Sequence, residues 1–98
     1  MTFSTKQNGT ALEVAVEGRL DTVTAPELEE KLMPVVGSFN ELVFDFSKLE
    51  YISSAGLRVL LRAHRGLQFG GKTKLTGCNT IVREVLSVTG FDEILDIE

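Results

Sequence analysis

The sequence predicts an α/β fold with a mixed, mostly parallel sheet that opens with an antiparallel hairpin, in the element order ββαβαβαβ. Two patterns predict it. Apolar and polar residues alternate near the N-terminus, as in half-buried strands, and strand-like and helix-like segments then alternate to the end of the chain. This second pattern is typical of parallel strands joined by right-handed crossovers. Because 98 residues suffice for one core but not for two, we expect a single domain over residues 1–98.

The first two strands are predicted on either side of Asn8-Gly9, a pair that readily adopts the positive φ angles of a tight hairpin turn. The second strand, residues 10–18, alternates apolar and polar side chains, which indicates one buried face. The first helix is predicted to follow, because residues 24–27 (TAPE) match a capping box with proline in the first turn. Pro34 interrupts this helix, and we expect it to stop before Gly37.

A short buried strand is predicted at residues 41–46, and a second helix runs from Ser54 to the Gly70-Gly71 pair. We expect His64, beside the apolar face of this helix, to be partly buried with a local hydrogen-bond partner. The inward face is predicted to contain Leu57, Val59, Leu60, Leu61, Ala63, His64 and Gln68.

The rest of the chain predicts a weak strand at residues 72–77 near the sheet edge, a third helix and a short closing strand within residues 91–98. Asn79 or Thr80 is expected to cap the third helix, and Gly90 to end it. The residues predicted to point inward from this helix are Ile81, Val82, Val85, Leu86 and Thr89.

Composition argues against several functions. A net charge of −4 and an acidic pI disfavour nucleic acid or an anionic membrane surface as the main partner. The single cysteine, Cys78, forbids an internal disulfide and fits a reducing compartment. We find no secretory signal pattern and no apolar run of membrane-spanning length, so we expect a cytoplasmic protein without membrane insertion. We also expect the protein to be a monomer.

Polar residues gather in the loops that precede the first two helices. In such sheets, functional residues concentrate at the carboxyl ends of the strands. We expect Asp21 and Asp45 to lie on the same rim as the adjacent serines Ser53 and Ser54. The alternative is that both carboxylates only cap their own loops.

Ser53 and Ser54 open the second helix and allow two interpretations. In the first, Ser53 is the N-cap and Ser54 an ordinary first-turn residue. In the second, the serines form an anion site or one of them carries a phosphate, since the positive end of a helix stabilises negative charge. The sequence ISSAG does not match the G-x-S-x-G elbow of a hydrolase, and His64 lies roughly 15 Å along the helix from Ser54. With no acid–base set, phosphate-binding glycine motif or zinc-ligand set, we expect no enzymatic activity, cofactor or metal.

Two sequence blocks resemble the STAS domain in its anti-sigma factor antagonist branch. EGRLDTVTAPELEEKL resembles the family's G-x-L-D-x-x-T-A pattern, and LVFDFSKLEYISSAGLRVLL resembles its D-x-S block that ends in S-(S/T/A)-G-L. The resemblance covers the whole chain. It implies binding to an anti-sigma factor, often a serine protein kinase, which frees a sigma factor. It also implies inactivation by phosphorylation of the serine two residues before the motif glycine, Gly56, and reversal by a PP2C-type phosphatase.

By this resemblance Ser54 is the implied phosphoacceptor. The sequence departs from the family pattern at two positions beside Ser54. Ser53 stands where the family often has aspartate, and Ala55 stands where it has a hydroxyl residue. Ser53 therefore remains a rival acceptor. Arg58, four residues after Ser54, is positioned to pair with a phosphate or a partner carboxylate. The implied interface contains Asp21, Thr24, Asp45, Ser53, Ala55, Gly56 and Arg58. STAS-like domains also serve as constitutive docking subunits of membrane lipid or anion transport systems, which is the alternative function.

Overall fold

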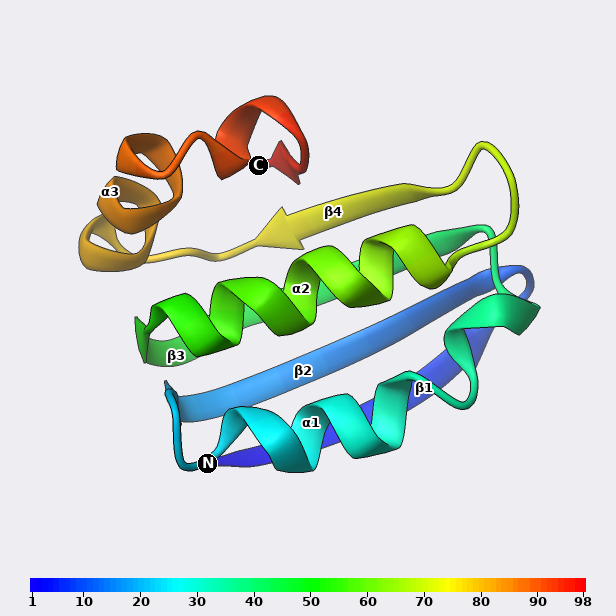
Figure 1. The fold of residues 1–98 in the computed structure, drawn as a ribbon, viewed down its shortest axis with the longest axis horizontal. Coiled ribbons are helices and arrows are strands. Elements are labelled where there is room, and N and C mark those ends of the chain that lie inside the picture. The colour runs from blue at the N-terminus through cyan, green and yellow to red at the C-terminus, as the bar shows by residue number, and fades with distance from the viewer.

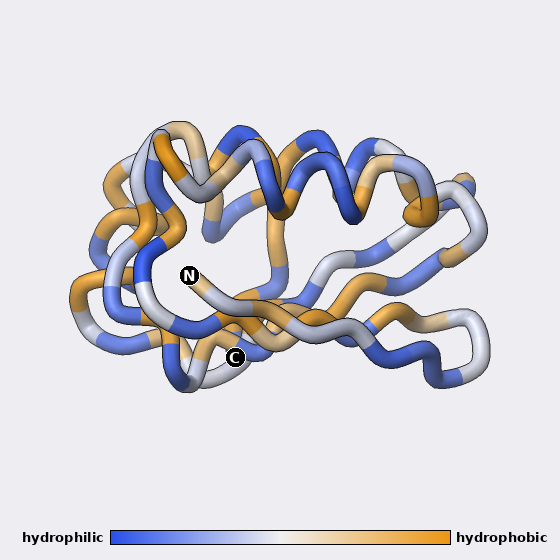
Figure 2. The backbone as a smooth tube through the Cα atoms, turned by 90° about the horizontal axis from the view of Figure 1, so that it is seen from below, coloured by the Kyte–Doolittle hydropathy of each residue, from blue (hydrophilic) through white to orange (hydrophobic).

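The elements of the chain form two layers. The computed structural model describes residues 1–98, and in it α1 and α2 lie side by side on one face of a five-stranded sheet (Figures 1 and 2). The other face of the sheet is at least partly exposed and carries polar residues such as Glu13, Asp45 and Lys74 beside the apolar Ala15 and Val43. The elements are β1 (Thr2–Asn8), β2 (Ala11–Leu20), α1 (Ala25–Leu32), β3 (Glu41–Ile52), α2 (Ser54–Gly66), β4 (Lys72–Thr76), α3 (Thr80–Val88) and β5 (Asp96–Ile97), with 3₁₀ turns η1 (Val36–Ser38) and η2 (Phe91–Glu93).

The topology confirms the predicted fold class. The strand order is β1-β2-β3-β4-β5, with β1 antiparallel to β2 and every other neighbouring pair parallel. The hairpin turn lies one residue later than predicted, because Asn8 pairs with Ala11 and leaves Gly9-Thr10 as the loop. Gly9 has a φ of +63°, which supplies the left-handed conformation that a tight turn needs.

The core lies between the sheet and the helices and consists of one cluster of 23 buried apolar side chains. The rings of Phe44 and Phe46, both on β3, lie 5.4 Å apart. Thr73 is the one buried polar residue, and its hydroxyl shares a 2.7 Å hydrogen bond with His64 Nδ1. This confirms the predicted role of His64 as a partly buried residue with a local partner.

The prediction for β3 is wrong in length. This strand continues to Ile52 rather than ending at residue 46, because β2 runs beside it as far as Leu20. The register between β2 and β3 shifts twice. The first shift lies between the pairs Ala15–Asp45 and Glu17–Lys48, and the second between the pairs Gly18–Leu49 and Arg19–Tyr51, so β3 contains two bulges. These two bulges break the two-residue alternation of buried side chains, which is why the segment after residue 46 looks like a loop in the sequence.

The starts of α2 and α3 agree with the sequence, but α2 ends at Gly66 and not at the predicted Gly70-Gly71 pair, because the backbone becomes extended at Leu67. Ser53 caps α2 and Asn79 caps α3, where the Asn79 side chain accepts a 2.8 Å hydrogen bond from Val82 N–H. Gly90 ends α3 with a φ of +79°. Three residues predicted to point inward are exposed instead: Gln68, Ile81 and Thr89.

Candidate functional site

The candidate site lies where β2 and β3 end side by side. Leu20 and Ile52, the last residues of these strands, are register partners. Beyond them, Ser53 N–H donates a 2.9 Å hydrogen bond to the Leu20 carbonyl, which joins the start of α2 to the end of β2. Residues 21–24 and the first turn of α2 therefore lie together at the carboxyl ends of β2 and β3 (Figure 1). We call this end of the sheet, formed by residues 21–24 and 53–58, the edge.

Gly56 makes this close approach of α2 possible. It is buried in the first turn of the helix. A Cβ at this position would lie 2.8 Å from the Leu20 carbonyl oxygen and 2.8 Å from Ile52 Cγ1. No larger residue fits unless the helix moves away from the sheet.

The two serines have different structural roles. Ser53 has extended backbone angles and is the N-cap, and its Oγ accepts a hydrogen bond from Gly56 N–H at 3.4 Å. Ser54 is the first residue of α2 and is exposed, and its hydroxyl makes no hydrogen bond within the protein. Ala55 follows it and is partly buried against the core. The interpretation of Ser53 as a cap is confirmed, and Ser54 is accessible.

Asp21 organises the neighbouring loop. Its Oδ1 accepts hydrogen bonds from Val23 N–H at 3.0 Å and from Thr24 N–H at 3.1 Å. The hydrogen bond from the Thr24 backbone is the largest influence that lowers the pKa of Asp21 below its usual value, and further bonds from the Thr24 hydroxyl and Val23 and the charge of Arg19 act in the same direction.

The predicted capping box at residues 24–27 is absent. The one proton of the Thr24 hydroxyl lies between two acceptors, the Arg19 carbonyl at 2.8 Å and Asp21 Oδ1 at 3.1 Å. The hydroxyl oxygen accepts from Asp21 N–H at 2.9 Å, so it turns back into the loop and does not reach the helix N–H groups. Asp21 takes over the role of holding the start of α1, since Ala25 N–H also bonds to the Asp21 carbonyl at 2.8 Å.

We expect Asp21→Asn to lower stability at pH 7, because the amide keeps the shape of the side chain but removes the charge that strengthens its hydrogen bonds. The folded pKa is depressed, so this stabilisation is present above the usual pKa of 3.8 and is lost as the pH falls through the folded value. Urea titrations between pH 7 and pH 2.5 should show the two proteins converging at the acidic end. A constant difference across this range would contradict the assignment, and Asp92→Asn, at an exposed residue without a hydrogen bond, is the control.

Asp45 does not lie on the rim, which corrects the prediction. It is seven residues before Ile52 on β3, which places it roughly 20 Å from the end of the strand at about 3.3 Å per residue. Its carboxylate Oδ1 accepts a 3.0 Å hydrogen bond from Ser47 N–H. The Ser47 side chain and backbone, in that order, are the largest influences that lower the pKa of Asp45. Asp45 thus stabilises the first bulge of β3. Its carboxylate makes a local hydrogen bond, as in the alternative interpretation that Asp21 and Asp45 only cap their own segments.

Some features of this edge have no counterpart in the sequence patterns. The side chain of Val23 is 86% exposed, beside the hydrogen-bonded Asp21. The Arg19 guanidinium lies 4.5 Å from the centre of the Tyr51 ring and 3.8 Å from Asp21 Oδ2. Only Val23 could have indicated part of this surface from the sequence, because it is an apolar residue within an otherwise polar loop.

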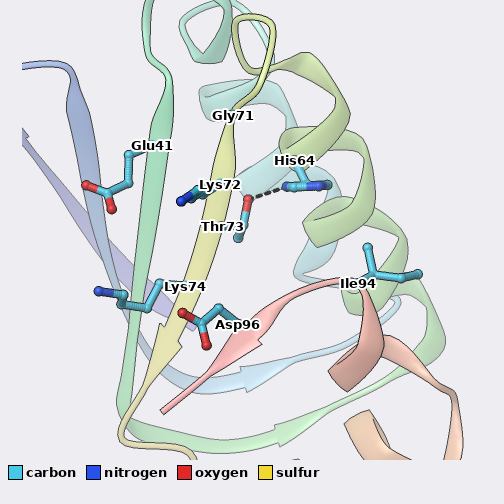
Figure 3. Close-up of a pocket in the computed structure, with 8 residues that line it drawn as sticks. All are labelled: Glu41, His64, Gly71, Lys72, Thr73, Lys74, Ile94 and Asp96. Atoms are coloured by element: carbon cyan, nitrogen blue, oxygen red, sulfur yellow. Dashed lines mark hydrogen bonds between the residues drawn. The ribbon is translucent and has the colours of Figure 1, made fainter.

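The hollow shown in Figure 3 lies away from this edge, around the start of β4. It has a volume of about 440 Å³ and contains the His64–Thr73 hydrogen bond. Its charged lining residues are the basic Lys72 and Lys74 and the acidic Glu41 and Asp96, and Lys74 is paired with Glu98 at 3.1 Å. Its lining residues are Glu41, His64, Gly71, Lys72, Thr73, Lys74, Ile94 and Asp96. No group of three or more His, Cys, Asp or Glu side chains gathers in the protein in a way that suits a metal ion.

The site is therefore an exposed edge formed by a polar loop, a helix N-terminus and one apolar side chain. Such a surface offers little enclosure for a small molecule, and its mixture of apolar and polar groups suits contact with another protein. None of the helices is both long and apolar enough to cross a membrane.

Comparison with known proteins agrees with this arrangement. The chain is similar to the anti-sigma-B factor antagonist of Bacillus subtilis, with 30% identity over 94% of this chain and 85% of the relative. It is also 35% identical to BtrV of Bordetella bronchiseptica, over 88% of this chain and 76% of that protein. The crystal structure of an anti-sigma factor antagonist from Mycobacterium paratuberculosis has the same fold, with a TM-score of 0.87 and 28% identity over 98% of this chain and 83% of that one. The model of the STAS domain family matches residues 2–98, and the chain belongs to this family.

Proposed function

We propose that this protein is an anti-sigma factor antagonist, and that phosphorylation of Ser54 switches its binding off. The observation that carries the proposal is the exposed Ser54 hydroxyl at the first position of α2, next to the loop of residues 21–24. The Bacillus subtilis relative, at 30% identity, is named as an antagonist of this kind. The docking surface consists of this loop and the first turns of α2.

The structure around Ser54 supports modification without unfolding. Its hydroxyl has no partner to lose, and the cap of α2 is provided by Ser53. A phosphate at this position would sit at the positive end of the helix dipole, which stabilises negative charge. The phosphate would therefore not unfold the protein. It would add a charge of about −1.5 to −2 to the surface that a partner contacts.

Ser53 is the weaker candidate for the acceptor. Its side chain is partly buried and its oxygen accepts the Gly56 N–H hydrogen bond. Phosphorylation there would require the cap to open, at a cost of about 1 kcal/mol in helix stability. The kinase is then the anti-sigma factor itself or an associated serine kinase, and a PP2C-type phosphatase restores the active form.

We expect Ser54→Asp to weaken binding at least about tenfold, which corresponds to roughly 1.4 kcal/mol, whereas Ser54→Ala binds like the wild type. Binding should be measured by calorimetry against each purified anti-sigma factor kinase from the source genome. Ser38→Asp is the matched control, because Ser38 is exposed in η1 at the opposite end of the sheet.

Mass spectrometry after incubation with the same kinases and ATP locates the modified residue. Phosphate on Ser54 alone agrees with the proposal. Binding that is unaffected by Ser54→Asp, together with no phosphate uptake, would refute the switch and would favour a constitutive docking role in a transport system.

A further inference from the structure

We infer that Arg58 reads the phosphorylation state of Ser54. In the unmodified protein the Arg58 guanidinium is offered to a carboxylate of the docked partner, and after phosphorylation it pairs with the phosphate on its own helix. This inference rests on the proposed function, because it takes Ser54 as the phosphoacceptor.

The helix brings the two side chains together. Ser54 and Arg58 are four residues apart on α2, and both are exposed. Residues at this spacing have Cβ atoms about 6 Å apart on one helix face. Helical side chains lean toward the N-terminus, so the Arg58 side chain extends over the turn that carries Ser54.

Arg58 is also available. The helix α2 contains three arginines and no acidic residue. Arg62 forms an ion pair with Glu29 of α1, whereas Arg58 forms neither an ion pair nor a side-chain hydrogen bond. A guanidinium without a partner, next to a docking surface, is suited to a carboxylate supplied by another protein.

The other charged groups of this edge do not compete for these roles. Arg19 already contacts Asp21 and the ring of Tyr51. Asp21 uses its Oδ1 for the N–H groups of its own loop. A phosphate on Ser54 would therefore find Arg58 as the uncommitted cation within one helical turn.

This pairing gives the switch a mechanism beyond charge repulsion. A phosphate offers three acceptor oxygens, and arginine can engage two of them at once. Once the phosphate holds Arg58, the partner loses the guanidinium that its carboxylate contacted. Phosphorylation then removes a favourable contact as well as adding negative charge.

The cis pair can be tested without any kinase, with phosphoserine incorporated at position 54 during translation. We expect the second pKa of this phosphate, followed by ³¹P NMR at low salt, to be about 0.3 unit higher in Arg58→Gln than in the wild type. Arg65→Gln is the matched control, since Arg65 is an exposed arginine of α2 without an ion pair, three turns away, and should leave the value unchanged. Equal phosphate pKa values in the wild type and Arg58→Gln would overturn the cis pair.

The partner contact is tested with the kinase that binds the wild type in the calorimetric experiment. We expect Arg58→Gln to weaken binding of the unphosphorylated protein about tenfold, and phosphorylation to weaken Arg58→Gln by a smaller factor than it weakens the wild type. If phosphorylation weakens binding by the same factor in the wild type and in Arg58→Gln, the phosphate and the partner do not compete for Arg58, and the inference is overturned. The failure of the proposed function is distinguishable, because it would appear as absent binding or absent phosphorylation while the ³¹P comparison still reports on Arg58.

Discussion

We expect Gly56→Val to lower the free energy of unfolding by about 3 kcal/mol, because the position has no room for a side chain. The first added carbon would lie 2.8 Å from the Leu20 carbonyl oxygen and 2.9 Å from Leu20 Cγ. That carbonyl is also the acceptor for Ser53 N–H, so it cannot move without loosening the start of α2. Urea denaturation measures the change, and thermal unfolding should show a fall of about 4–8 °C for each kcal/mol.

The matched control is Gly37→Ala in η1, where the nearest atom to an added Cβ is 3.8 Å away and φ is not in the left-handed region. This variant should keep wild-type stability within about 0.5 kcal/mol. The smaller change Gly56→Ala should remain folded but weaken partner binding, because α2 must shift away from the edge that carries Ser54. If Gly56→Val and the wild type have the same midpoint of urea denaturation, the close contact between α2 and β2 is contradicted.

The fold was largely predictable because most elements carry their own local signals. The glycine at the hairpin, the serine before α2 and the asparagine before α3 mark their boundaries through backbone conformation and capping. The full length of β3 was not predictable, since its last residues depend on pairing with β2 across two bulges, which no local pattern specifies. The absent capping box has the same kind of cause, because the Thr24 hydroxyl is drawn to the Arg19 carbonyl instead.

The candidate site was predictable in part for the same reason. Ser53, Ser54 and Gly56 are placed by the helix that they begin, so local sequence identifies them. Asp45 was assigned to the wrong place because its distance from Ser54 depends on where β3 ends. The unpaired state of Arg58 depends on what the rest of the fold brings near it, so sequence indicates only its spacing from Ser54.

We expect Gly77→Ala to lower the free energy of unfolding by about 3 kcal/mol, through two costs that act together. Gly77 has a φ of +72°, where a residue with a Cβ is strained by roughly 1–2 kcal/mol. The added Cβ would also lie 2.8 Å from Ser47 Cα and 2.9 Å from Ser47 N, and these backbone atoms belong to the first bulge of β3, between Asp45 and Lys48.

Gly70→Ala separates the two costs, because Gly70 has a similar φ of +79° but nothing within 4 Å of an added Cβ. Urea denaturation should show a loss of only about 1 kcal/mol for this control. The excess loss at Gly77 then measures the contact between the exit of β4 and the bulge. Equal losses at the two glycines would contradict that contact. A larger loss at Gly77 would show that the loop after β4 packs on the first bulge of β3, the strand that ends at Ile52 directly before Ser53 and Ser54.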